Sequence, residues 1–113
     1  MNPLYDSRGK VIAFLRDNRR IIDLRGKSLA WIRGDDVYDY RGQHLGWWIR
    51  DHMRGPDGGV IVWLRGASPG VMLPLPNLPP LPPLPELEPL RPLPSLPPLR
   101  PLNTMNWSKY ALA

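Results

Sequence analysis

Four glycines at a nearly constant spacing divide the first part of the chain into copies of one unit. They are Gly9, Gly26, Gly42 and Gly58, which stand 17, 16 and 16 residues apart. Residues at equal distances from each glycine are alike in size, and one column holds a large aromatic residue in every copy: Phe14, Trp31, Trp47 and Trp63. Self-similarity at a fixed period indicates an array of one repeated unit. Residues 1–68 are therefore predicted to form a four-unit module.

The pattern inside each unit is typical of a β-hairpin. Three units begin with Asp-x-Arg-Gly, as in Asp6 to Gly9, and the fourth has Gly55-Pro56-Asp57-Gly58. An aspartate at the first position of a tight turn bonds to the backbone ahead of it, and a glycine at the fourth adopts a left-handed conformation without strain. About six β-prone residues then run to a second polar break, such as Asp17-Asn18.

Four hairpins make eight short strands, and a small all-β chain avoids open sheet edges most completely when the sheet closes on itself. The predicted fold class is all-β, with four repeated hairpins closed into a shallow four-fold symmetric barrel or ring. Core packing and an outer or end surface that needs a cover both remain open for the aromatic column. Trp47 and Trp48 are adjacent in a strand, so they point to opposite faces and we expect one of them at a surface.

A leucine occupies every third position from Leu75 to Leu102, and most residues between are proline. A polyproline II helix has three residues per turn, so the Leu/Pro-rich tail of residues 69–102 is predicted to be extended, and residues 75–102 to form a rod roughly 87 Å long with the ten leucines along one edge. Such an apolar ridge usually marks a contact surface. We expect it to pack on a partner, on other tails or on the module's aromatic column. The alternative is a Leu-Pro-Pro repeat expansion without function.

Two further features of the tail indicate contacts. Arg91 to Pro97 matches the basic-x-x-Pro-x-x-Pro form of SH3-domain ligands, a match that a proline-dense segment produces easily. Residues 103–113 form a short C-terminal segment, whose Trp107 and Tyr110 are predicted to dock on the module and plug a hydrophobic channel. A frayed terminus is the alternative.

The repeated strands Leu29 to Ile32 and Leu45 to Trp48 read Leu-Ala-Trp-Ile and Leu-Gly-Trp-Trp, and they accompany Asp-x-x-Gly turns. In these features residues 4–66 resemble the small bacterial four-fold beta-flower proteins. The resemblance implies a shallow symmetric β-structure with a hydrophobic central channel, similar in shape to the tubby C-terminal domain, and no established biochemical activity. The fourth copy departs from the pattern at Gly55, so we expect imperfect symmetry at that corner.

The composition of the chain and the spacing of its polar residues argue against catalytic, metal-binding and phosphate-binding sites. The chain has no cysteine, its only histidines are His44 and His52, and no nucleophile–base set, zinc spacing or phosphate loop is present. We therefore expect no enzyme activity, no metal and no cofactor. The net charge is +5, and closure would gather arginines into two rims that are candidate anion sites unless aspartates neutralise them: Arg8, Arg25 and Arg41 at turn tips, and Arg16, Arg33 and Arg65 near strand ends.

The sequence thus favours a non-catalytic binding or scaffold module. Self-association or a protein partner would involve the Leu/Pro tail, and nucleic acid is not expected. A peripheral membrane module that binds anionic lipid is the first alternative, and a small hydrolytic enzyme is the second. Because no signal peptide or membrane span is evident, we expect a cytoplasmic protein. The candidate site for an apolar ligand or a tail is the aromatic set Phe14, Trp31, Trp47, Trp48 and Trp63.

Overall fold

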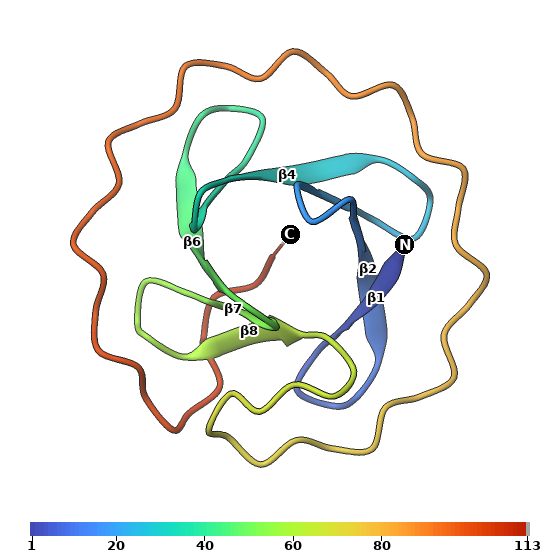
Figure 1. Cartoon of the computed structure of the whole chain (residues 1–113), viewed down its shortest axis with the longest axis vertical. Coiled ribbons are helices and arrows are strands. Elements are labelled where there is room, and N and C mark those ends of the chain that lie inside the picture. The colour runs from blue at the N-terminus through green and yellow to red at the C-terminus, as the bar shows by residue number, and fades with distance from the viewer. Residues whose placement is uncertain (113) are drawn as a thin grey trace.

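The chain forms a closed antiparallel barrel of eight strands in the computed structural model, which describes residues 1–112 (Figure 1). Each strand pairs with its neighbour in the sequence, and β8 returns to β1, where Trp63 lies opposite Tyr5. The predicted all-β barrel of four hairpins is confirmed. The strands are β1 (Asn2–Tyr5), β2 (Val11–Arg16), β3 (Arg20–Ile22), β4 (Ser28–Arg33), β5 (Asp36–Tyr38), β6 (His44–Ile49), β7 (His52–Arg54) and β8 (Val60–Trp63).

The glycine turns connect the units as the sequence predicts. In the first turn the Gly9 amide donates to the Asp6 carbonyl at 3.1 Å, and the Asp6 carboxylate accepts from two amides ahead of it at 2.8 and 3.0 Å. Gly9 has a φ of +78°, a left-handed conformation that residues with a Cβ atom rarely adopt. The fourth turn lacks the aspartate but keeps the backbone bond from Gly58 to Gly55, at 2.9 Å.

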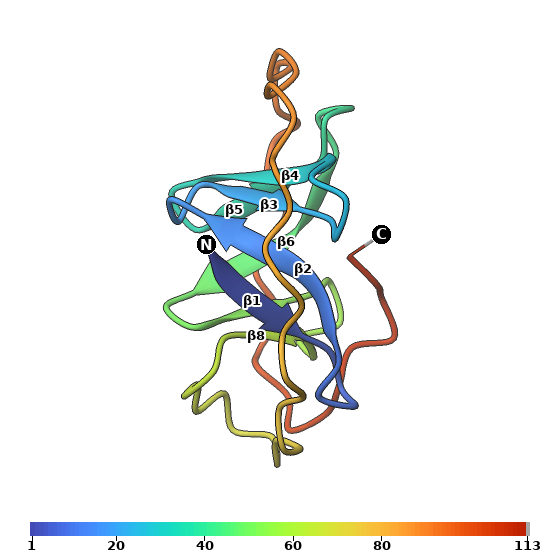
Figure 2. The ribbon, with the colours of Figure 1, turned by 90° about the vertical axis from the view of Figure 1, so that its right-hand side faces the viewer.

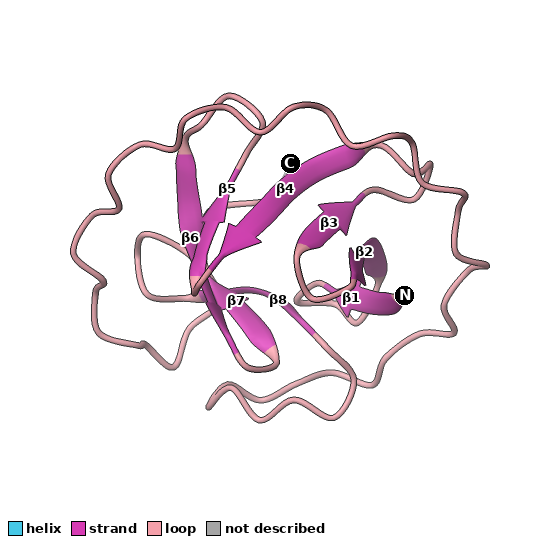
Figure 3. Cartoon of the chain, turned by 45° about the horizontal axis from the view of Figure 1, so that its top comes forward, coloured by secondary structure: helices cyan, strands magenta, loops and turns pink. Residues whose placement is uncertain are grey.

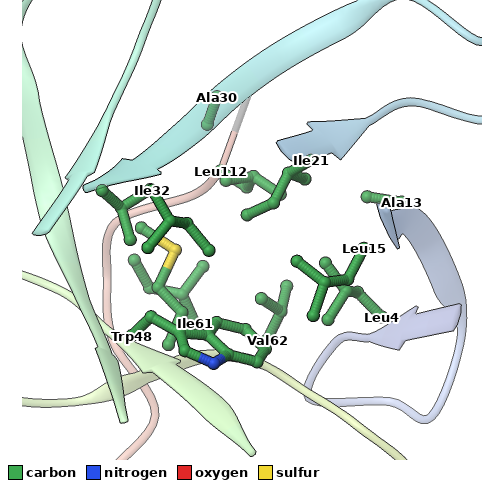
Figure 4. Close-up of a cluster of buried hydrophobic side chains, with 12 residues drawn as sticks. Leu4, Ala13, Leu15, Ile21, Ala30, Ile32, Trp48, Ile61, Val62 and Leu112 are labelled. Carbon is green, nitrogen blue, oxygen red and sulfur yellow. The ribbon is translucent and has the colours of Figure 1, made fainter. Parts of the chain in front are cut away.

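Alternate residues of the strands point into the barrel and out of it. Ala13 and Leu15 of β2 belong to an interior cluster that Figure 4 shows in close-up. The resemblance implied a hydrophobic channel at the centre of the barrel. In the structure this space holds buried side chains from every strand and Leu112 of the C-terminal segment. The cluster consists of Leu4, Ala13, Leu15, Ile21, Ala30, Ile32, Val37, Trp48, Met53, Ile61, Val62 and Leu112.

The aromatic column lies on the outer face of the barrel and is nevertheless buried. Phe14 stands between the inward-pointing Ala13 and Leu15, and it joins an outer cluster with Tyr5 and Trp63. Trp63 stacks on Tyr5 with ring centroids 4.9 Å apart and donates its indole N–H to a turn carbonyl at 2.8 Å. The sequence left two placements open for the aromatic column, and the structure has the outer one. The low exposure of these rings shows that other parts of the chain cover them.

The same alternation separates the adjacent tryptophans of β6. Trp48 belongs to the interior cluster, whereas Trp47 faces outward beside His44. Their exposed fractions are only 8% and 5%. The two rings therefore point to opposite faces as expected, but neither of them lies at a free surface.

The tail encircles the barrel. Figure 1 shows it as a nearly complete outer ring in yellow to red whose two ends approach each other at the bottom, Figure 2 shows the ring from its edge, and Figure 3 shows it in a tilted view. No strand or helix is assigned in residues 71–105, which we call the belt. Belt and barrel together make a disc with extents of 36 × 36 × 20 Å. The tail is thus wrapped around the module and is not a free rod.

Four hydrogen bonds attach the belt to the four glycine turns, at contacts that we call corners one to four. The amides of belt residues nine positions apart donate to the glycine carbonyls at 2.8 to 3.0 Å. The glycines lie so close to the belt that a Cβ on Gly26 would stand 2.1 Å from the Leu84 carbonyl oxygen. The bonded pairs are Asn77 with Gly9, Glu86 with Gly26, Ser95 with Gly42, and Thr104 with Gly58.

The length of the belt matches the circumference of the disc. Asn77 and Thr104 are 27 residues apart, a distance of about 84 Å at the polyproline II rise of about 3.1 Å per residue. These residues span three of the four quarters, and three quarters of a circle 36 Å across measure about 85 Å. An extended proline-rich chain therefore reaches each corner in register.

The C-terminal segment turns from the belt toward the barrel. Val60 of β8 donates to the Asn106 carbonyl at 3.1 Å and accepts from the Ser108 amide at 2.9 Å, which makes a parallel bridge with Trp107. Leu112 then enters the barrel and is 6% exposed (Figure 4). None of the residues described in the structure forms a helix that is long and apolar enough to cross a membrane.

We expect Gly26→Ala to lower the free energy of unfolding by about 3 kcal/mol, because it combines a strained φ of +90° with a clash against the belt backbone. Gly66→Ala is the matched control, since Gly66 has a φ of +86° and nothing within 4 Å of the added methyl group. The control should lose only about 1 kcal/mol. Urea unfolding measures both values, and equal losses would show that the belt does not press on the turn.

Candidate functional site

Every third residue of the belt projects away from the barrel. The ten leucines in this register have exposed fractions between 89% and 97%, and Met72 and Met105 continue it at 93% and 83%. The expectation that the leucine ridge packs on the module's own aromatic column is wrong, because the ridge faces outward. We call the following twelve residues the apolar rim: Met72, Leu75, Leu78, Leu81, Leu84, Leu87, Leu90, Leu93, Leu96, Leu99, Leu102 and Met105.

Prolines occupy the side of the belt that faces the barrel at the corners. Pro74, Pro83, Pro92 and Pro101 recur at the nine-residue spacing of the hydrogen bonds and are half-buried. Each is followed three residues later by the amide that bonds to a corner glycine. Proline lacks an amide hydrogen, so the bonding positions must be other residues, and they are Asn77, Glu86, Ser95 and Thr104.

Both ends of the belt meet at Arg54 in β7, which is only 3% exposed. One guanidinium nitrogen donates to the carbonyls of Gly58 and Thr104, both at 2.7 Å, and the other donates to the carbonyl of Pro69. Hydrogen bonds from an ionised donor are stronger than neutral ones. Arg54 therefore fastens the beginning and the end of the belt to the barrel at one point.

His52 orients the Arg54 side chain. The Nε of Arg54 donates to Nε2 of His52 at 3.1 Å, and Nδ1 of His52 lies 2.7 Å from the Asp51 carboxylate. Both bonds form when the proton of a neutral imidazole is on Nδ1. Burial lowers the pKa of His52, and the Arg54 charge lowers it further, while the hydrogen bond to Asp51 raises it in part. The neutral ring is thus the form that accepts from Arg54.

Barrel side chains also bind the belt at corners two and three. Arg20 donates to the Ser28 hydroxyl at 2.8 Å and to the Glu86 carbonyl at 2.6 Å. The Tyr38 hydroxyl donates to the Ser95 carbonyl at 3.1 Å. Burial raises the pKa of Tyr38, so its hydroxyl stays protonated as a donor. Different polar side chains of the barrel therefore bind the belt backbone in different quarters of the disc.

A family model described as 4-fold beta flower protein matches residues 2–113. The chain belongs to that family. The match extends through the belt and the C-terminal segment, beyond the residues 4–66 that carry the resemblance in the sequence. No curated protein and no solved structure matches the chain. The family model thus covers the belt together with the barrel.

The aromatic residues singled out in the sequence do not form an open site in this beta flower protein. Phe14, Trp31, Trp47 and Trp63 are 0% to 5% exposed on the outer face of the barrel, and Trp48 lies inside it. Arg91 of the belt covers Trp31, with its guanidinium carbon 5.2 Å from the ring centroid. Arg91 also pairs with Glu88 at 2.8 Å, so the arginine of the SH3-like motif already has partners within the chain.

The two docking residues predicted near the C-terminus have different environments. Trp107 is half-buried against the outer cluster, whereas Tyr110 is 46% exposed. The residue that enters the barrel is Leu112, which the sequence reasoning missed because a single leucine near a terminus carries no signal. A small cavity of about 220 Å³ lies between this segment and the barrel.

Most of the arginines in the two predicted rims are exposed. Arg16 is half-buried and lies 3.5 Å from the Asp17 carboxylate, whereas the other members are exposed along the turns and strand ends: Arg8, Arg25, Arg41, Arg33 and Arg65. The buried Arg54 and the half-buried Arg20, which do make specific contacts, were not singled out. A sequence signal for the belt contacts did exist, since Asn77, Glu86, Ser95 and Thr104 interrupt the proline pattern at intervals of nine.

The histidines have structural partners. His44 lies 2.8 Å from Asp36 and packs edge-on against the rings of Tyr38 and Trp47, and His52 supports Arg54 as described above. Among residues 1–112 no group of three or more histidine, cysteine, aspartate or glutamate side chains could hold a metal ion. The feature that the described chain leaves unpartnered is the apolar rim.

We expect Arg54→Met to lower the free energy of unfolding by about 3 kcal/mol or more, since the Pro69 and Thr104 carbonyls would lose their donor and the Gly58 carbonyl would keep only the Thr104 amide. Methionine retains much of the apolar packing of the arginine stem. Arg65→Met, at an exposed position, should change stability by no more than about 0.5 kcal/mol. Urea unfolding compares the two variants. Similar small effects would mean that Arg54 does not fasten the belt.

We expect acid to weaken the protein through His52. Its pKa in the folded state lies below the ordinary value of 6.5, so the unfolded state binds the proton first and stability falls as the pH drops below 6.5. The loss should stop once the pH is below the folded-state pKa. His52→Gln keeps a donor and an acceptor but does not titrate. Urea unfolding between pH 7 and pH 5 should show a steeper loss for the wild type, and parallel profiles would contradict this role.

Proposed function

We propose that this beta flower protein is a non-catalytic interaction module whose binding surface is the apolar rim. The observation that carries the proposal is the outward projection of twelve leucine and methionine side chains, each at least 83% exposed, around the whole edge of the disc. The aromatic set that the sequence favoured as a ligand site is already covered by the chain's own residues. The belt thus supplies a cover on its inner side and a contact surface on its outer side.

The size of the rim supports a role in binding. Burying a side chain such as leucine contributes about 1.5–3 kcal/mol, which corresponds to roughly 60–120 Å² at about 25 cal/mol per Å². Twelve such side chains expose roughly 700–1,400 Å² of apolar surface, more than the roughly 300–600 Å² of the largest patch on an ordinary monomer. An apolar surface of this extent is stabilised when another apolar surface covers it.

The contacts of the polar residues favour binding over catalysis. Both histidines and the buried Arg54 hold the belt or neighbouring strands together, and their hydrogen bonds are made within the chain. We also retain, as proposals, that the protein is not an enzyme and that it resides in the cytoplasm. Self-association, a protein partner and lipid remain the kinds of contact that an apolar rim could make.

The test replaces six rim leucines that lie between the corners: Leu78, Leu81, Leu87, Leu90, Leu96 and Leu99, each to serine. Their side chains are 91% to 97% exposed, so the variant should fold and melt like the wild type. We expect the wild type to self-associate in sedimentation velocity or to float with phospholipid vesicles, and the variant to do neither. A wild type that stays monomeric and ignores vesicles, or a variant that behaves identically, would refute the proposal.

A further inference from the structure

We infer that one side of the apolar rim docks on an anionic lipid surface. The inference depends on the proposed function and specifies its partner. It comes from the distribution of charge around the disc, which differs between two halves although the leucines are spaced evenly. The rim leucines are equivalent in exposure all around, so charge alone distinguishes one edge from the other.

The belt itself has a charge-free half. It passes corner four near Pro69, corner one at Asn77 and corner two at Glu86, and residues 66–85 contain no charged side chain. All four belt charges follow on the other half, at Glu86, Glu88, Arg91 and Arg100. We call residues 71–85 the charge-free arc. Its five rim residues are Met72, Leu75, Leu78, Leu81 and Leu84, which are 89% to 93% exposed.

The barrel beneath the charge-free arc carries few acidic side chains. Residues 1–18 and 58–70, which lie between corners four and two, contain four basic and two acidic residues, a net charge of +2. Arg19 and Arg20 lie beyond this arc, because Arg19 lines a hollow with Arg91 of the belt and Arg20 donates to the Glu86 carbonyl. The other half of the disc holds the remaining six aspartates and both belt glutamates. The edge without belt charges is therefore the edge with the fewest acidic groups behind it.

Two exposed cations stand at the middle of the arc. Arg8 and Lys10 flank Gly9, the glycine that contacts the belt at Leu75. The acidic residue of this turn, Asp6, is engaged by backbone amides at 2.8 and 3.0 Å. Arg25 and Lys27 flank the next corner glycine in the same way. In the unit opposite, the equivalents of Arg8 and Lys10 are Arg41 and the uncharged Gln43.

Leucines that project from a surface flanked by basic side chains match the boundary between lipid headgroups and acyl chains. The leucines enter the acyl region to a shallow depth, and the cations meet anionic headgroups. A second copy fits this arc poorly, because two convex edges touch at few leucines and the exposed Arg8 and Lys10 of the two copies repel each other. The disc would stand on its charge-free edge, with the half that holds most of the acidic residues away from the membrane.

Vesicle flotation of the full-length protein tests the inference, with phosphatidylcholine vesicles that contain about one third phosphatidylserine or none. Leu78→Ser with Leu81→Ser should weaken binding roughly 30-fold. The matched control is Leu96→Ser with Leu99→Ser, two quarters further along the rim and 93% and 97% exposed. It should stay within about twofold of the wild type. Unchanged thermal melting shows that both variants fold.

The charge requirement has its own pair of variants. Arg8→Gln with Lys10→Gln should weaken binding to anionic vesicles roughly tenfold or more, whereas Arg41→Gln with Arg50→Gln removes two exposed charges from the other half and should have little effect. Equal losses in either matched pair, or equal binding to neutral and anionic vesicles, would overturn the inference. Without vesicle binding, leucine-dependent self-association would overturn only the lipid partner, and its absence would overturn the proposed function as well.

Discussion

Both faces of the barrel strands are apolar, and the rest of the structure depends on how each face is covered. Closure of the sheet encloses Ala13, Leu15 and their equivalents, but Phe14 and the tryptophans of its column point outward. An eight-stranded barrel of 66 residues cannot bury its own outer surface. The belt covers this surface, so the proline-rich tail is a second layer of the fold and the disc is complete only with it.

The spacing of the corner hydrogen bonds and the three-residue turn of the belt together determine that the leucine side chains point away from the barrel. Corner hydrogen bonds recur every nine belt residues, and nine residues are three turns of a chain with three residues per turn. The same edge of the belt therefore faces the barrel at every corner, and the leucine edge must face the same way all around. Since prolines and the bonding amides occupy the inner side, all twelve rim residues project outward. One geometric match thus produces both the attachment and the exposed surface.

The sequence predicts the barrel well because its signals are local and repeated. The glycine spacing, the Asp6-type turns and the alternation around Phe14 each act within a few residues, and all three agree with the structure. The belt could not be placed from period three alone, since a leucine ridge is compatible with facing inward or outward. Arg54 was missed because its role depends on Pro69 and Thr104, which are close only after the belt has closed. Leu112 likewise acquires its burial only from the completed barrel.

Amide hydrogen exchange of the intact protein tests most directly whether the belt is part of the folded structure. The informative amides are those of Asn77, Glu86, Ser95 and Thr104, which donate to the four corner glycines. A wrapped belt predicts protection of all four, lost together with the protection of the barrel strands as denaturant is added. Exchange of these amides at the rate of an unstructured peptide, beside a protected barrel, would contradict the account.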